Sequence, residues 1–244
     1  MSDRIAVIGA GQMGNGIVHV CAVAGHDVTM IDVSQSALDK ARATIEKNLD
    51  RQVKKGALAE EAKAAALARI STSTTIDAVA NATFVIESAT ENVELKHRIF
   101  ADVDRLAPVG AVLATNTSSI SITEIAGRVQ RPEFVIGMHF MNPVPVMQLV
   151  EVIRGLATSD DTTARTVALA RAVGKTPVEV NDYPGFVANR ILMPMINEAV
   201  YCVMEGVGTP EAIDQVMKLG MNHPMGPLML ADFIGLDTCL AILE

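Results

Sequence analysis

The stretch from residue 5 to residue 32 constrains this chain most. It holds a short apolar run, a glycine-rich turn, a helix of small residues that ends at Gly25, and a second apolar run closed by Asp32. The turn reads Gly-Ala-Gly-Gln-Met-Gly and covers residues 9–14. This order of strand, turn, helix and strand is typical of a βαβ unit that binds a dinucleotide. The flanking strands, and the position of Asp32 at the end of the second one, favour that interpretation over an ordinary glycine-rich turn.

The residue types in this unit fit separate tasks. Gly9 makes the tight turn, Gly11 lets backbone N–H groups approach a pyrophosphate, and Gly14 lets the helix pack closely on the strand. Asp32, at the end of the second strand, accepts a hydrogen bond from a ribose 2′-hydroxyl and repels a 2′-phosphate. The sequence therefore predicts NAD, rather than NADP, as the cofactor.

Composition argues against several other classes of protein. A net charge of −8 and 3% aromatic residues argue against a nucleic-acid partner. The apolar runs are too short or too interrupted to cross a membrane, and the first residues carry no signal-peptide pattern. The three cysteines are scattered and have no partner motif, so we expect no metal site and a reducing, cytoplasmic location.

Further apolar runs predict the rest of the fold. We expect strands at residues 83–88, 111–116, 134–139, 148–153 and 177–180, and helices at 93–106 and 166–173. The fold class is α/β, with a Rossmann-type, mostly parallel sheet in residues 1–183. A smaller all-α domain follows in residues 184–244. Apolar residues on nearly every face of a helix at 191–204 predict that this helix is buried, either within the chain or by another subunit.

Polar residues follow two of the expected strands. Ligands of such sheets bind beyond the carboxyl ends of the strands, which places residues 88–92 and 116–119 over the cofactor. The second segment reads Asn-Thr-Ser-Ser and precedes an apolar helix expected at 120–125. A serine that only caps this helix is therefore the alternative to a role in the site.

A histidine and a glutamate carry the expected proton chemistry. One strand delivers His139 to the same edge of the sheet, and Asn142 begins the turn that ends it. Histidine can take and return a proton near neutral pH, as alcohol oxidation requires. Glu151 is the only carboxylate in the next apolar strand, where an acid is costly unless it is paired. We expect the two side chains to pair, which would raise the basicity of His139.

Basic residues gather on a helix that is predicted to begin near Gln35. Lys47, Arg51, Lys54 and Lys55 share one face of that helix because they lie at positions i, i+4, i+7 and i+8. A solvated face explains such a run as well as a binding site for a polyanionic ligand group. Charge alone leaves both interpretations open.

Several motifs resemble those of the short-chain L-3-hydroxyacyl-CoA dehydrogenases, in the same order along the whole chain. They are Val-Ile-Gly-Ala-Gly-Gln-Met-Gly at 7–14, Asn-Thr-Ser-Ser-Ile at 116–120, His-Phe-Met-Asn-Pro-Val-Pro at 139–145, Leu-Val-Glu at 149–151 and Pro-Gly-Phe-Val-Ala-Asn-Arg at 184–190. The resemblance implies an NAD-dependent oxidoreductase that interconverts (S)-3-hydroxybutyryl-CoA and acetoacetyl-CoA by hydride transfer. It also implies a homodimer.

The resemblance assigns roles to individual residues. It implies that Ser118, the base His139, the orienting Glu151 and Asn189 are catalytic, and that Ser118 and Asn189 bind substrate. It implies that the basic helix face, with Arg51, Lys54 and Lys55, meets CoA. The implied cofactor contacts are Gly9, Gly11, Gln12, Met13, Gly14, Asp32, Glu91, Lys96, Asn116, Ser118 and Asn142.

The chain also departs from the family pattern, and two other functions stay open. Met141 stands where the family usually has a phenylalanine, and Tyr183 stands where a small residue is usual. Family members also extend further, so we expect a chain truncated inside a helix. One alternative is an NAD-dependent sugar-acid dehydrogenase, which would not need the basic helix face. The other is a non-catalytic, crystallin-like NAD-binding protein, against which the complete set of catalytic residues argues.

Overall fold

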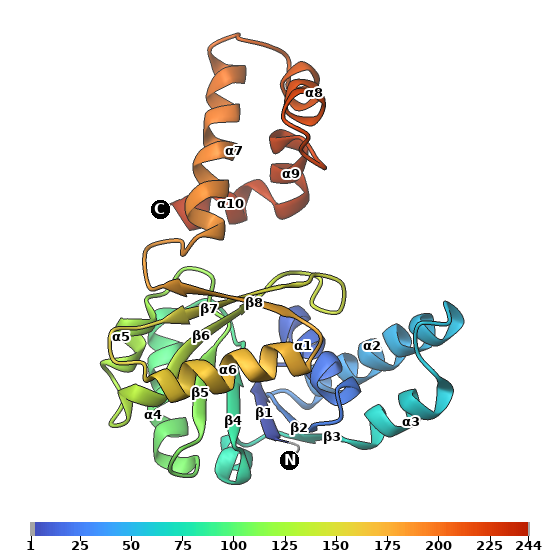
Figure 1. Cartoon of the computed structure of the whole chain (residues 1–244), viewed down its shortest axis with the longest axis vertical. Helices are drawn as coiled ribbons and strands as arrows, with labels where there is room; N and C mark the ends of the chain where they lie inside the picture. Colours follow the sequence, from blue (N-terminus) through green and yellow to red (C-terminus); the bar gives the residue numbers. More distant parts are fainter. Residues whose placement is uncertain (1–2, 244) are drawn as a thin grey trace. The chain divides into compact units, whose positions relative to one another are not determined.

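The computed structural model describes residues 3–243 of the chain (Figure 1). These residues divide into two compact units, and the division falls between Asp182 and Tyr183. The first unit, blue to yellow in Figure 1, carries the sheet, and the second, orange to red, contains helices. The α/β fold class with a following helical domain, predicted from the sequence, is confirmed.

The first unit is built on one eight-stranded sheet, in the order β3-β2-β1-β4-β5-β6-β7-β8. The strands β6 and β7 pair antiparallel, and every other neighbouring pair is parallel. The last two strands therefore run against the other six. The strands are β1 (Arg4–Ile8), β2 (Asp27–Ile31), β3 (Ile70–Ser73), β4 (Phe84–Glu87), β5 (Val112–Thr115), β6 (Val135–Phe140), β7 (Leu149–Arg154) and β8 (Thr176–Asn181).

Helices connect the strands and make up the second unit. Those of the first unit are α1 (Gln12–Val23), α2 (Gln35–Lys54), α3 (Glu60–Ala68), α4 (Val93–Leu106), α5 (Ile122–Ala126) and α6 (Asp160–Ala172), with short 3₁₀ helices η1 (Ile76–Asn81) and η2 (Pro132–Phe134). Those of the second unit are α7 (Ala188–Met204), α8 (Pro210–Gly220), α9 (Pro227–Ile234) and α10 (Leu236–Leu243).

Side chains alternate between the two faces of the sheet, and both faces are buried in the central strands β4, β5 and β6. In β6, Ile136, Met138 and Phe140 join a core cluster with residues of α1, α2 and α6. The intervening residues, including His139, project from the opposite face, which is also the face of Glu87 in β4. The chemistry-bearing side chains of the strands thus share one face.

The helix α6 begins six residues earlier than its predicted start at residue 166. The Ser159 side chain caps it by accepting a hydrogen bond from the backbone N–H of Thr162. The first turn is polar in sequence, yet Thr162 and Thr163 are buried. The apolar periodicity therefore missed this turn, which the capping signal predicts.

The chain by itself buries only part of the helix at 191–204, and burial of the rest by another subunit stays a prediction. In α7 the described buried residues are Met193, Ile196 and Ala199, whereas Ile191 is 66% exposed and Met204 is 69% exposed. The buried residues Met193 and Ile196 cluster with Ala231 of α9 and Cys239 of α10. One face of α7 is therefore packed within the unit, and other apolar side chains face outward.

Candidate active site

A cavity of about 750 Å³ opens where the strand order reverses, at the carboxyl ends of β1 and β4. The glycine loop after β1 lines it, as do residues 88–90 after β4 and Asp32 after β2. Open parallel sheets bind nucleotides at this kind of position. The topology therefore places a ligand cavity against the segment that the sequence singled out.

The three glycines of the loop are required for different reasons. Gly9 has a φ of +105°, and a Cβ there would lie 2.4 Å from the Ser88 carbonyl oxygen. A Cβ on Gly14 would lie 1.8 Å from the Gly9 carbonyl oxygen. A Cβ on Gly11, by contrast, would meet no atom of the described chain within 4 Å. Packing excludes side chains at the first two positions, whereas the open space at Gly11, at the N-terminus of α1, fits the approach of a pyrophosphate.

Asp32 ties the glycine loop to the end of β2. Its Oδ2 accepts from the backbone N–H of Ala10 at 2.9 Å, and its Oδ1 accepts from that of Ser34 at 3.0 Å. A carboxylate has further acceptor positions on both oxygens. Since the side chain also lines the cavity, it can take a ribose hydroxyl.

Two asparagines join the loop region to the ends of β5 and β6. Asn116 Oδ1 accepts from the backbone N–H of Phe140 at 2.8 Å. Asn142 Oδ1 accepts from Gln12 Nε2 at 3.1 Å, so the turn after β6 contacts the glycine loop. Met13 packs, half-buried, against the core. The predicted cofactor residues of these segments therefore lie along one edge of the sheet.

His139 and Glu151 face each other across the β6–β7 ladder. They are directly paired in the antiparallel register, and His139 Nδ1 lies 2.8 Å from Glu151 Oε2. His139 is 8% exposed and Glu151 is 2% exposed. An ionised carboxylate only accepts hydrogen bonds, so a neutral imidazole beside it has its proton on Nδ1 and its lone pair on Nε2. The antiparallel pairing of β6 with β7 therefore holds the His139 imidazole buried and in a fixed orientation.

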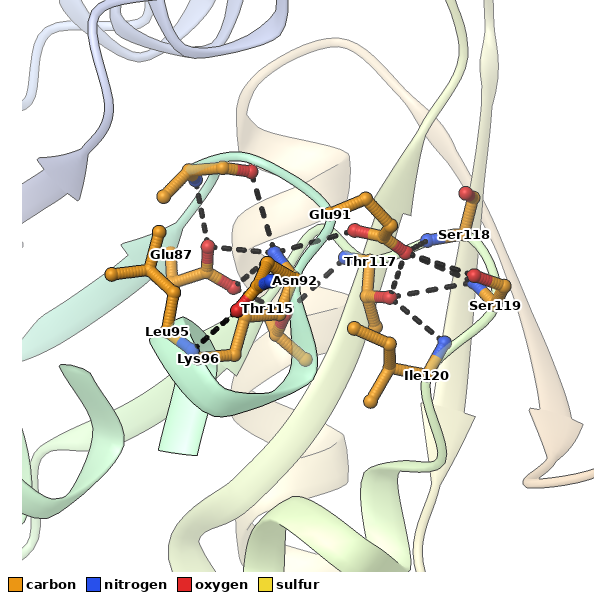
Figure 2. Close-up of polar contacts among 11 residues, drawn as sticks. Glu87, Glu91, Asn92, Leu95, Lys96, Thr115, Thr117, Ser118, Ser119 and Ile120 are labelled. Atoms are coloured by element: carbon orange, nitrogen blue, oxygen red, sulfur yellow. Dashed lines mark hydrogen bonds and ion pairs between the residues drawn. The ribbon is translucent and has the colours of Figure 1, made fainter. Parts of the chain in front are cut away.

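A second buried carboxylate, Glu87, lies on the same face of the sheet as His139, and Figure 2 shows its contacts. Lys96 of α4 donates to its two oxygens at 2.8 and 2.9 Å, and both residues are 1% exposed. The Thr115 hydroxyl and the Ala89 N–H complete its shell at 2.6 and 2.7 Å. Such a pair is tolerated only because each charge is hydrogen-bonded, and loss of one partner would leave a buried, uncompensated charge.

Glu91 gathers the turn that contains Ser118. Its Oε1 accepts from the Thr117 hydroxyl, from the Ser118 N–H at 3.0 Å, and from the N–H and hydroxyl of Ser119 at 3.3 and 3.1 Å (Figure 2). Its Oε2 lies 3.4 Å from Lys96 Nζ. Burial raises the pKa of Glu91, but the Lys96 charge and these hydrogen bonds together hold that pKa below its ordinary value. Glu91 is therefore ionised at neutral pH and orders the Ser118 turn.

The remaining predicted site residues belong to α4, to α7 and to the end of α2. Lys96 binds Glu87, the Ala89 carbonyl and Glu91, and its contact with NAD stays a prediction. Asn189 is the second residue of α7, in the second unit. Arg51, Lys54 and Lys55 are exposed at the end of α2.

Sequence reasoning missed Glu87 and Thr115 as parts of the site, whereas Thr117 belongs to the segment 116–119 that it singled out. Glu87 is a single acid in an apolar strand. The cost of an unpaired buried acid, which singled out Glu151, applies equally to Glu87 and could have found it. Thr115 carries no such signal, because threonine is common in strands.

The structure also bears on membranes and metals. Within residues 3–243, no helix combines the length and the apolar character that crossing a membrane requires. The same described residues contain no group of three or more His, Cys, Asp or Glu side chains placed to hold a metal ion.

The strand order, the glycine loop with its acid, and the buried His–Glu pair define a dinucleotide-dependent dehydrogenase. The family description "3-hydroxyacyl-CoA dehydrogenase, NAD binding domain" matches residues 4–183, and that of the family's C-terminal domain matches residues 185–244. The chain belongs to the 3-hydroxyacyl-CoA dehydrogenase family, and its first unit is an NAD-binding domain.

Similar proteins are found among bacterial enzymes. A probable 3-hydroxybutyryl-CoA dehydrogenase of Bacillus subtilis is 58% identical over 241 residues, which are 99% of this chain and 84% of the relative. A 3-hydroxybutyryl-CoA dehydrogenase of Bradyrhizobium diazoefficiens is 54% identical over 99% of this chain and 82% of the relative. The crystal structure of (S)-3-hydroxybutyryl-CoA dehydrogenase from Ralstonia eutropha, 53% identical, superposes with a TM-score of 0.97 over 100% of this chain and 86% of that one.

The glycine geometry predicts that Gly11→Ala and Gly14→Ala will fail differently. The Gly11 methyl enters open space, so the variant should melt like the parent while its Kd for NADH rises roughly tenfold or more. The Gly14 methyl must displace the Gly9 carbonyl, which should cost about 3 kcal/mol of unfolding free energy. Denaturant unfolding and NADH fluorescence titration test both. A Gly11→Ala variant that loses stability but keeps its affinity would contradict this interpretation.

Proposed function

We propose that this enzyme interconverts (S)-3-hydroxybutyryl-CoA and acetoacetyl-CoA with NAD, and that His139 and Glu151 form its proton-transfer pair. The observation that carries the proposal is the buried His139–Glu151 hydrogen bond of 2.8 Å. Because β6 runs parallel to β1, the C-terminal end of β6 lies at the same edge of the sheet as the glycine loop. The names of the relatives above support the choice of substrate.

NAD, which the glycine loop and Asp32 would hold in the cavity, would supply hydride transfer at C3 of the substrate in either direction. His139 Nε2 accepts the proton of the 3-hydroxyl during oxidation and gives it back during reduction. Glu151 fixes the tautomer and stabilises the imidazolium. Ser118, on the turn that Glu91 holds, and Asn189 donate hydrogen bonds to the substrate oxygen, where negative charge develops.

Replacing His139 by Gln should reduce turnover by roughly two to four orders of magnitude, the usual contribution of a positioned general base. Glu151→Gln should also reduce turnover, since it removes the charge that stabilises the imidazolium. Initial rates with acetoacetyl-CoA and NADH measure both effects, and NADH titration serves as the control that cofactor binding is intact. Near-normal turnover in His139→Gln would mean that the proton moves through another group.

The exposed basic end of α2 supports CoA as the carrier of the substrate. CoA contains a 3′-phosphate and a pyrophosphate, and Lys–phosphate contacts at an exposed site weaken as salt screens them. The double variant Lys54→Ala/Lys55→Ala should therefore raise the KM for acetoacetyl-CoA and flatten its salt dependence. The KM for NADH should not change, and kcat should fall less, because such contacts bind ground and transition states about equally.

Two truncated substrates and one variant provide the controls. Parent and double variant should use acetoacetyl-pantetheine alike, because it lacks the 3′-phosphate and the pyrophosphate. Lys218→Ala removes an exposed lysine of α8 and should leave the KM for acetoacetyl-CoA unchanged. Efficient reduction of free acetoacetate would instead favour the free-acid alternative, a sugar-acid type of dehydrogenase. An equal loss on acetoacetyl-pantetheine would mean that the lysines act on the fold.

We further propose that the enzyme is a homodimer joined through the second unit. Large apolar side chains of that unit are exposed, among them Ile191, Met204, Leu219 and Phe233. Clusters of exposed apolar surface are typical of protein interfaces. Sedimentation equilibrium should give twice the chain mass at micromolar concentration, and a monomer under those conditions would contradict the proposal.

The cytoplasmic location that the sequence predicts stays part of this proposal. The three cysteines, Cys21, Cys202 and Cys239, are all free thiols. Free thiols are typical of proteins in a reducing compartment.

A further inference from the structure

Lys175, between α6 and β8, is a buried ammonium that the mechanism does not use. It is 8% exposed, and its Nζ donates to the carbonyl oxygens of Val144 at 2.5 Å and Met147 at 2.8 Å. No carboxylate within residues 3–243 forms an ion pair with it. Burial lowers the pKa of Lys175 because desolvation disfavours the charged form. A buried cation is costly, so its two carbonyl contacts are the feature to explain.

The two carbonyls belong to the connection between β6 and β7, the strands that carry His139 and Glu151. This connection folds into a turn, because the N–H groups of Val146 and Met147 both donate to the Pro143 carbonyl at 2.9 and 3.0 Å. Lys175 lies next to the first residue of β8, and the backbone N–H of Thr176 donates to the Gln148 carbonyl at 2.8 Å. The start of β8, the outermost strand, and Lys175 before it therefore hold one side of the turn.

The other side of the turn contacts the cofactor loop. Val144 packs on α1 so closely that a Cβ on Gly16 would lie 2.8 Å from the Val144 Cβ. Asn142 accepts the hydrogen bond from Gln12 of the glycine loop. The position of Asn142 relative to that loop thus depends on where the turn is held.

We propose that Lys175 is a positioning residue, which anchors the turn at residues 142–147 and thereby holds Asn142 against the cofactor loop. This inference rests on the proposed function, because it takes Asn142 as a cofactor contact. An apolar side chain of similar length could fill the same space, but it could not bind the Val144 and Met147 carbonyls. Lys175 therefore acts on NAD binding through the turn, without contact with the reacting atoms.

The test compares Lys175→Met with Lys175→Arg and with a matched control, Lys63→Met. Lys63 also places an ammonium between two oxygens, those of Asp50 at 2.6 Å and Glu60 at 3.2 Å, but on α3. In cofactor-free protein, Lys175→Met should speed amide exchange at Val146 and Met147 about tenfold or more, since local opening becomes easier. It should raise the Kd for NADH more than it lowers kcat. Lys175→Arg should restore part of the affinity for NADH. Lys63→Met should change neither the amide exchange at Val146 and Met147 nor the Kd for NADH.

A double-mutant cycle on the Kd for NADH tests the path through Asn142. If Lys175 acts through Asn142, Lys175→Met should weaken NADH binding in the parent and have little further effect in Asn142→Ala. Additive losses, or unchanged exchange at Val146 and Met147, would overturn the inference. The amide-exchange and Kd measurements need no substrate, so an enzyme inactive on acetoacetyl-CoA would contradict the proposed function alone. An Asn142→Ala variant with unchanged affinity for NADH would remove the cofactor contact and overturn the inference with it.

Discussion

The contact between the first turn of α1 and the end of β1 sets the geometry of the cofactor edge. Gly14 and the Gly9 carbonyl are so close that any side chain would separate helix and strand. Gly9 in turn touches the backbone of Ser88 after β4, and Asp32 binds the Ala10 N–H from the end of β2. These three contacts together hold the loops after β1, β2 and β4, and the N-terminus of α1 lies at the cavity that they line.

Two buried carboxylates, one in β4 and one in β7, order the part of the site that lies on the strands. Glu87 and Glu151 project from the same face of the sheet, and each is hydrogen-bonded to a basic side chain. Glu87 binds Lys96 of α4, and Glu151 binds His139 of the neighbouring strand β6. Buried pairs of this kind add little stability but make misplacement costly, since a displaced partner leaves a charge without solvent. Thr115, which links Glu87 to β5, carries this order toward the Ser118 turn.

The parts that could be predicted from the sequence depend on local pattern. The glycine loop and two features of α2 each occupy a short window, so periodicity and turn chemistry define them. In α2 these features are the Ser34 side chain, which caps the helix by accepting from the Ala37 N–H, and the buried stripe of Leu38, Ala41, Ile45 and Leu49. The four hydrogen bonds that Glu91 Oε1 accepts, and the Lys175 contacts, join residues 26 to 31 positions apart. No local rule specifies such contacts, because they depend on how the strands are ordered.

The direct pairing of His139 with Glu151 also makes their hydrogen bond an indicator of correct strand alignment. Side chains alternate between faces, so a shift of β7 by one residue would send Glu151 to the other side of the sheet. A collapsed chain with most of its secondary structure but a slipped β6–β7 ladder would lack the pair entirely. During refolding, formation of the pair should therefore follow closure of this ladder rather than the earlier gain of helix or compactness.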